Sequence, residues 1–183
     1  MKHIYKLAQG IDVAEAHSEI LSVGDKWWNA HPERTSSKES PHREIDDIWL
    51  RYQSRQELLV GSSQMEPHES VFYPAWEDFP AIQSIVFDVM RFSRATRLGG
   101  ILLTKIPAGK MCYPHTDNGW HAKYYEKFAV QIRASHGQAF CFDDGRFESI
   151  TGDLYTFDNH VGHWVENPTD EDRITLIICI RRS

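Results

Sequence analysis

The chain has 183 residues, which fits one domain with a sizeable buried core. Its residues are 41% hydrophobic and 25% charged, as in an ordinary globular protein. The formal net charge of −6 argues against a general binder of nucleic acid or anionic membranes, and no apolar run approaches the length of a membrane span. The first residues lack the apolar core of a signal peptide, so a cytoplasmic location is expected.

Two helices are predicted in the first 99 residues. Asp12 followed by Glu15 fits a capping box, and this helix is expected to end near Gly24. The second helix should begin at Pro80, because proline suits the first helical position. It should stop before Gly99, because glycine readily takes a left-handed cap.

A loop and a strand lie between these helices. The segment 34–43 is rich in serine and charge, which indicates a mobile loop. The segment 45–52 predicts a strand with Ile48, Leu50 and Tyr52 on one face.

From residue 100 onward, short β segments separated by turns predict an antiparallel sandwich or barrel. In the segment 127–133, apolar and polar residues alternate, so Lys127 and Gln131 share the polar face. That face points either toward an interior site or simply toward solvent. We expect a single domain over 1–183, with 1–99 as a mixed helical and strand part and 100–183 as the core of the β-roll.

The segment 107–117 contains a histidine and an aspartate two residues apart. Residues i and i+2 of a strand project from the same face, so His115 and Asp117 would point at a common position. A third ligand must come from elsewhere in the chain. Two histidines and one carboxylate leave coordination positions of a metal open, which is the arrangement of non-haem Fe(II) oxygenases.

Two later histidines compete for the third ligand position. His163 precedes Arg173 by ten residues and is followed by Trp-Val-Glu-Asn. This context favours His163, and it leaves His160 as a supporting or loop residue.

Arg173 and Thr175 would project from the same face of the last strand. A guanidinium binds a carboxylate through two parallel hydrogen bonds. A dicarboxylate that chelates the metal at one end and meets Arg173 at the other is 2-oxoglutarate. The alternative is that Arg173 pairs with an acidic side chain of the turn 169–172.

The remaining potential ligands are assigned structural roles. Cys112, Cys141 and Cys179 are odd in number and lie in apolar segments, which indicates buried free thiols. His121 and His136 have no partner at ligand spacing, so both are expected at the surface.

Several short pieces of the sequence occur in an informative order. They are 45–52, Thr104 to Gly109, Tyr113 to Asp117, Lys127-Phe128, Gly152-Asp153, Asp158, His163 to Asn167, and Arg173. In this order and spacing the chain resembles the aspartyl/asparaginyl β-hydroxylase family of Fe(II)/2-oxoglutarate-dependent oxygenases. The resemblance is close over the C-terminal part and looser over the N-terminal part.

The resemblance implies a mainly β fold with flanking helices, the cupin-like double-stranded β-helix or jelly roll. It implies that His115, Asp117 and His163 hold Fe(II) and carry catalysis. Arg173 would bind the far carboxylate of 2-oxoglutarate, with O₂ as the second cosubstrate. Some family members have glycine in place of Asp117, whereas this chain keeps all three ligands.

Further cosubstrate contacts are implied by the same resemblance. Thr104 falls where the family places a hydroxyl near 2-oxoglutarate, and Lys127 falls where the family has an arginine. Gln131 and Thr175 share faces with Lys127 and Arg173, and we include them as candidates. The family often has a histidine where this chain has Ala129, so the contact to the metal-proximal end of the cosubstrate differs.

The implied activity is hydroxylation of an unactivated C–H bond. The candidate target is the β-carbon of an aspartyl or asparaginyl group in a peptide or small molecule. Two alternatives stay open: a cupin-like metal dioxygenase that does not use 2-oxoglutarate, and a non-catalytic β-roll that binds a ligand or protein. Trp120, Tyr124 and Tyr125 in the loop 118–126 either line the substrate opening or simply pack.

Overall fold

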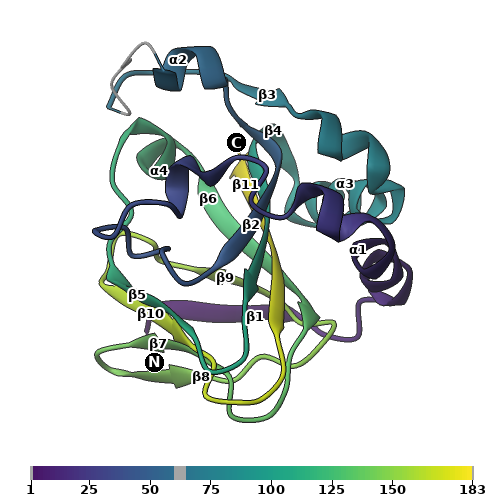
Figure 1. Ribbon diagram of the computed structural model, residues 1–183, viewed down its shortest axis with the longest axis vertical. Helices are drawn as coiled ribbons and strands as arrows, with labels where there is room; N and C mark the ends of the chain where they lie inside the picture. The colour runs from purple at the N-terminus through teal and green to yellow at the C-terminus, as the bar shows by residue number, and fades with distance from the viewer. Residues whose placement is uncertain (1, 60–64, 183) are drawn as a thin grey trace.

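The structure is a computed structural model that describes residues 2–59 and 65–182. Within this part, two antiparallel sheets lie face to face, and helices cover the outer side of the larger sheet (Figure 1). The strands are β1 (Ile4–Ala8), β2 (Asp46–Gln53), β3 (Ser70–Phe72), β4 (Ala95–Ile106), β5 (Met111–His115), β6 (Glu126–Arg133), β7 (Ala139–Phe142), β8 (Gly145–Phe147), β9 (Leu154–Phe157), β10 (His163–Glu166) and β11 (Arg173–Arg182). The helices are α1 (Ala14–Trp27), α2 (Arg55–Leu59), α3 (Pro80–Ser93) and α4 (Trp120–Tyr124), with 3₁₀ turns at Pro32–Arg34 and Pro74–Asp78. Among the described helices, none has the length and apolar character to cross a membrane.

Strands distant in sequence are neighbours in both sheets. The larger sheet has the order β1-β9-β6-β11-β4-β2-β3, and the smaller sheet has the order β5-β10-β7-β8. The last strand, β11, lies between β6 and β4, while β10 lies between β5 and β7. This exchange of strands between two sheets is that of a jelly roll, so the predicted fold class is confirmed.

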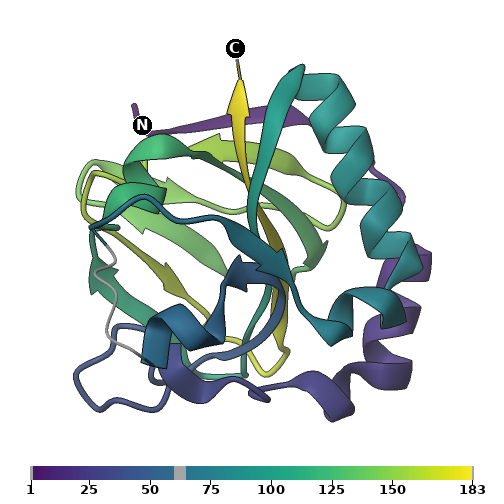
Figure 2. The same cartoon turned by 90° about the horizontal axis from the view of Figure 1, so that it is seen from above.

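The alternation of residues along the strands gives the larger sheet two different faces. On the outer face, apolar side chains of β6 and β11 such as Phe128 and Leu176 pack against α1 and α3 in the main core. Figure 2 shows both helices on that side of the sheet. On the inner face, Ala129 and Tyr155 pack against Phe140 of the smaller sheet. The polar residues of β6 and β11 therefore face the interior between the two sheets.

The first helix differs from the prediction at both ends. It begins at Ala14, whose N–H donates to Asp12 Oδ1 at 3.1 Å, without the reciprocal bond of a capping box. It runs through Gly24 to Trp27. A Cβ at Gly24 would lie 2.8 Å from Trp28 Nε1. The glycine thus makes room for an indole ring and does not end the helix.

The second helix begins at Pro80 as predicted but ends before the expected glycine. Its last turn is closed by Arg94 in the left-handed conformation, with φ of 54°. Gly99 lies within β4, where a Cβ would be 2.9 Å from the Tyr125 ring. Close packing, and not a helix cap, explains this glycine.

The predicted strand 45–52 forms as β2, but Tyr52 lies on the opposite face from the one expected. The pairing of β2 with β4 shifts register between Trp49 and Arg51, which marks a β-bulge. Ile48 and Leu50 pack in the main core, whereas Tyr52 packs with Trp49 toward the interior between the sheets. The bulge thereby adds an aromatic side chain to the inner face.

Gly152 provides a test of how tightly the N-terminal segment is held against the sandwich. Its φ is +85°, and a Cβ would lie 2.7 Å from the Ile11 carbonyl oxygen. We expect Gly152→Ala to lower the free energy of unfolding by about 3 kcal/mol and the melting temperature by about 9 °C. Gly109→Ala is the matched control, because Gly109 has φ of +71° but nothing within 4 Å of the added Cβ. The control should cost only about 1 kcal/mol, and equal losses in both variants would contradict the role given to the Ile11 contact.

Candidate metal centre

His115, Asp117 and His163 converge on one point between the sheets. Their potential ligand atoms all lie within 4.8 Å of one another. The two imidazole rings are 4.4 Å apart between centroids, and His115 Nε2 is 3.8 Å from Asp117 Oδ1. Such a set of two imidazoles and one carboxylate is suited to a divalent metal ion.

Strand pairing explains how these residues meet. β10 pairs with β5 so that His163 is directly opposite His115. Asp117 lies just beyond the end of β5, where its N–H donates to the carbonyl of Asn159 at 2.9 Å. The loop that leads to His163 therefore also holds the backbone of Asp117.

Both imidazoles are oriented by backbone carbonyls. His115 Nδ1 lies 2.7 Å from the carbonyl oxygen of Tyr113, and His163 Nδ1 lies 2.8 Å from that of Val161. A carbonyl can only accept, so Nδ1 carries the proton in each ring and Nε2 is free to bind a metal. Burial lowers the pKa of His163 to about 4. A neutral imidazole, the form that binds metal, is thus favoured.

Lys127 determines which oxygen of Asp117 is available. The Lys127 ammonium donates to Asp117 Oδ2, while Oδ1 faces His115. Burial alone would raise the pKa of Asp117, but Lys127 and the two imidazoles lower it below its ordinary value. The carboxylate is therefore ionised, with one oxygen held by a cation and the other directed at the metal position.

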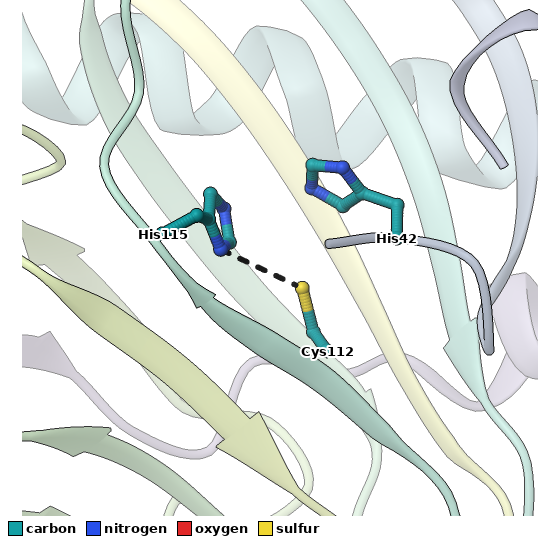
Figure 3. Close-up of side chains that lie close together, drawn as sticks. All are labelled: His42, Cys112 and His115. Atoms are coloured by element: carbon teal, nitrogen blue, oxygen red, sulfur yellow. Dashed lines mark hydrogen bonds between the residues drawn. The ribbon is translucent and has the colours of Figure 1, made fainter. Parts of the chain in front are cut away.

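A second cluster shares His115. His42, Cys112 and His115 also have potential ligand atoms within 4.8 Å of one another (Figure 3). The distance between Cys112 Sγ and His115 Nδ1 is 4.0 Å. That nitrogen is already bonded to the Tyr113 carbonyl. Burial raises the pKa of the Cys112 thiol to about 12, and a neutral thiol is a poor ligand. The His115, Asp117 and His163 cluster is the better metal site.

The other histidines have clear positions. His160 is exposed, and its N–H donates to Asp158 Oδ1 at 3.0 Å in the loop before β10. His136 is at the surface, as predicted. The prediction for His121 was wrong: its Nε2 accepts the N–H of Gly100 at 3.1 Å, and burial lowers the pKa of its ring to about 3. This hydrogen bond connects α4 to β4.

The predicted arginine lies in a buried polar network. Arg173 is 1% exposed, and both terminal nitrogens donate to Ser149 Oγ at 3.1 Å. One of them also donates to the Tyr155 hydroxyl at 3.2 Å. The acidic turn pairs with a different arginine, since Arg133 forms the ion pair with Glu171. Within residues 2–59 and 65–182, Arg173 has no carboxylate partner.

Of the other predicted cosubstrate residues, some belong to this network and some do not. Gln131 and Thr175 belong to it, because Thr175 Oγ1 donates to Gln131 Oε1 at 3.3 Å. Gln131 is fully buried, so solvent exposure is excluded for it. Thr104 pairs with Thr175 across β4 and β11, but its hydroxyl donates to the Thr175 carbonyl at 3.2 Å and not to Arg173. Lys127 belongs to the metal cluster instead.

A cavity of about 560 Å³ opens beside the metal cluster. Its walls include His115, Asp117 and Lys127 from the metal cluster and Arg34 and His42 from the segment 34–43. Among the predicted rim residues, the loop 118–126 contributes neighbours of the three aromatic residues but not Trp120, Tyr124 or Tyr125. Trp120 and Tyr124 stack on each other at 4.7 Å between centroids, which favours the packing interpretation.

The segment 34–43, predicted to be a mobile loop, is anchored over this cavity. The Pro41 carbonyl accepts the N–H of Tyr113 at 2.9 Å, and the Arg43 guanidinium lies 3.3 Å from the centroid of the Tyr113 ring. Arg34 donates to the buried Asp47 at 2.6 Å. Arg34 and His42 could not be recognised from the sequence, because nothing near them marks them as neighbours of the metal ligands.

The fold and the site define a class of protein. The donor set fits Fe(II), and a buried arginine without a carboxylate fits an anionic cosubstrate. Arg173 Nε is buried and has no hydrogen-bond partner in the described structure, which points the same way. A site of this kind is that of an Fe(II)- and 2-oxoglutarate-dependent oxygenase.

Comparison with known proteins gives the family. The model of the family described as aspartyl/asparaginyl beta-hydroxylase matches residues 17–183, so the chain belongs to that family. No curated protein matches the sequence significantly.

Solved structures agree on the fold. A prolyl hydroxylase from Trichoplax adhaerens, in complex with a peptide fragment of the hypoxia inducible factor oxygen degradation domain, matches with a TM-score of 0.66 and 10% identity, covering 98% of this chain and 84% of its own. A 2OG-Fe(II) oxygenase family oxidoreductase from Burkholderia pseudomallei has a TM-score of 0.65 and 14% identity, covering 99% and 86%. A viral collagen prolyl hydroxylase from Paramecium Bursaria Chlorella virus-1, in a 2OG complex, has a TM-score of 0.58 and 12% identity, covering 100% and 97%.

Metal-induced stabilisation distinguishes the two clusters. At a Mn(II) concentration about 100-fold above the Kd, binding should add about 2.7 kcal/mol of stability and raise the melting temperature by about 5–10 °C. We expect His163→Ala to abolish this increase, because it removes a ligand of one cluster only. His160→Ala should retain it. Loss of the increase in Cys112→Ala or His42→Ala, with retention in His163→Ala, would assign the metal to the second cluster.

Proposed function

We propose that the protein hydroxylates the β-carbon of an aspartyl or asparaginyl group, carried by a peptide or a small molecule. The family description supports this target. A peptide substrate is also consistent with a structural neighbour that was solved in complex with a peptide fragment. The observation that carries the oxygenase assignment is the buried Arg173, which lacks a carboxylate partner in the described structure and lies in the same interior as the two-histidine, one-carboxylate cluster.

The residues of this chain take the following roles in the proposal. His115, Asp117 and His163 would hold Fe(II) with their two imidazoles and the carboxylate. Lys127 holds the second oxygen of Asp117, which keeps the carboxylate in a single orientation. Arg173 would bind the far carboxylate of 2-oxoglutarate.

Bound Fe(II) and 2-oxoglutarate supply the oxidising chemistry, in which O₂ hydroxylates a C–H bond while 2-oxoglutarate becomes succinate and CO₂. The protein contributes position and the exclusion of water. Leu102, Ile177 and Cys179 give the cavity beside the metal cluster an apolar wall. Such a wall limits the access of water to the C–H bond that reacts.

The charge of Arg173 also separates this proposal from a cupin-like dioxygenase without 2-oxoglutarate. A fully buried cation without a partner of opposite charge costs several kcal/mol. In an enzyme that does not bind a dicarboxylate, no ligand would offset that cost. The described structure offers the cation only neutral hydroxyl partners, which leaves its charge for a ligand.

Cosubstrate binding provides the direct test. Anaerobic addition of 2-oxoglutarate to the Fe(II)-loaded protein should produce the weak visible charge-transfer band of the chelate. Arg173→Ala should raise the Kd of 2-oxoglutarate by about 100-fold, since it removes charge-assisted hydrogen bonds to the far carboxylate. Arg133→Ala is the matched control, because Arg133 pairs with the acidic turn, and its Kd should be unchanged. A wild-type protein that binds Fe(II) but gives no band would contradict the proposal.

The target carbon is tested separately. Peptides that contain a single aspartate, asparagine or proline are incubated with the Fe(II)-loaded enzyme, 2-oxoglutarate and O₂, and products are located by fragmentation mass spectrometry. We expect the mass of one added oxygen on the β-carbon of the acidic or amide residue. Hydroxylation of the proline peptide alone would refute the aspartyl or asparaginyl target while leaving the enzyme class intact.

A further inference from the structure

We propose that Ser149 and Tyr155 are positioning residues for the cosubstrate: they hold the Arg173 guanidinium so that its charge stays available to the far carboxylate. This inference rests on the proposed function and extends it to two residues that belong to none of the motifs of the sequence. The evidence for it is the direction of the hydrogen bonds around Gln131. That direction determines that each hydroxyl presents an oxygen lone pair to Arg173.

The amide of Gln131 has only one orientation that satisfies its surroundings. Its Nε2 lies 2.8 Å from two backbone carbonyl oxygens, those of Arg133 and Ile174. A carbonyl oxygen can only accept a hydrogen bond, so the nitrogen of the amide must face this side. The amide oxygen must then face the side chains of Ser149, Tyr155 and Thr175.

The hydroxyls therefore direct their protons toward Gln131. Ser149 Oγ donates to Gln131 Oε1 at 2.8 Å, and the Tyr155 hydroxyl donates to it at 3.4 Å. Burial raises the pKa of Tyr155, so its hydroxyl keeps the proton that it donates. With their protons used in this way, both oxygens present lone pairs to the guanidinium.

Those lone pairs orient Arg173 without neutralising it. Ser149 accepts from both terminal nitrogens and Tyr155 accepts from one of them. A guanidinium has five N–H groups, and the Nε of Arg173 is buried without a partner in the described structure. An aspartate or glutamate at either position would form an ion pair and would compete with a carboxylate ligand. Neutral acceptors hold the planar group and leave its charge for the ligand.

The position of the two residues fits this role. Tyr155 lies on β9, where it faces the smaller sheet beside Ala129 and Phe140. Ser149 is 3% exposed and precedes β9. Both residues donate to Gln131 on β6 and accept from Arg173 on β11. Three separate strands or segments of the sandwich thus fix one guanidinium, whose side chain would otherwise be flexible.

The experiment compares two ligands that differ only at the far end. Wild type, Ser149→Ala, Tyr155→Phe and Arg173→Ala are loaded anaerobically with Fe(II), and the charge-transfer band is titrated with 2-oxoglutarate and with 2-oxobutanoate, which lacks the far carboxylate. We expect Ser149→Ala and Tyr155→Phe each to raise the Kd of 2-oxoglutarate by about tenfold. The Kd of 2-oxobutanoate should stay within about twofold of wild type, because that ligand does not contact Arg173.

Matched variants control for general effects on the fold. Ser93→Ala removes a hydroxyl that bonds within α3, and Tyr5→Phe removes one from an exposed tyrosine on β1. Neither should change the Kd of either ligand. Ser149→Thr keeps the hydroxyl and should bind 2-oxoglutarate more tightly than Ser149→Ala, which provides a measurement even where the alanine variant folds poorly.

The outcomes separate this inference from the proposed function. If Arg173→Ala weakens binding of 2-oxoglutarate while Ser149→Ala and Tyr155→Phe stay within about twofold of wild type, only the positioning role is refuted. Equal losses for 2-oxoglutarate and 2-oxobutanoate in the two hydroxyl variants would also refute it, because they would indicate general damage to the site. Absence of the band in the Fe(II)-loaded wild type would remove both the proposed function and this inference.

Discussion

The pairing of β10 with β5 is the interaction on which the functional site depends. It places His163 opposite His115 although the two are far apart in sequence. The same strand pairs with β7 on its other side, so the position of His163 is fixed from both edges. A strand of only His163–Glu166 can hold a ligand in place because neither of its edges is free. The position of His163 is thus set by sheet hydrogen bonding on both sides of its strand.

The larger sheet contributes the remaining residues of the site, and its two faces have different roles. The outer residues of β6 and β11 fill the main core beneath α1 and α3, which fixes the strands. Their inner residues are not part of the main core and can therefore be polar, as Lys127, Gln131 and Arg173 are. Lys127 bonds to Asp117 in the metal cluster. Gln131, four residues further along β6, belongs with Arg173 to the buried polar network. The apolar Ala129 separates the two groups.

Much of this arrangement could be predicted from the sequence because it rests on periodicity and spacing. Alternation in β6 placed Lys127 and Gln131 on one face, although it left open whether that face points inward or toward solvent, and the His115, Asp117 and His163 order indicated the metal cluster. Ser149 and His42 could not be predicted, because their roles depend on contacts with distant strands and no local pattern marks them. Tyr52 was placed on the wrong face because a β-bulge reverses the alternation, and Gly24 was misread because a glycine that accommodates a neighbouring ring looks like one that caps a helix.

The buried thiols of the site have a consequence for the choice of metal. Cys112 borders the metal cluster, and Cys179 lines the cavity beside it. Burial raises the pKa of Cys112 to about 12 and that of Cys179 to about 11. Thiolates would capture soft ions such as Cu(I) and would compete for zinc. Because burial favours the protonated thiols, a soft ion could bind these sulfur atoms only by displacing a proton, and this cost favours the nitrogen and oxygen donors of the metal cluster.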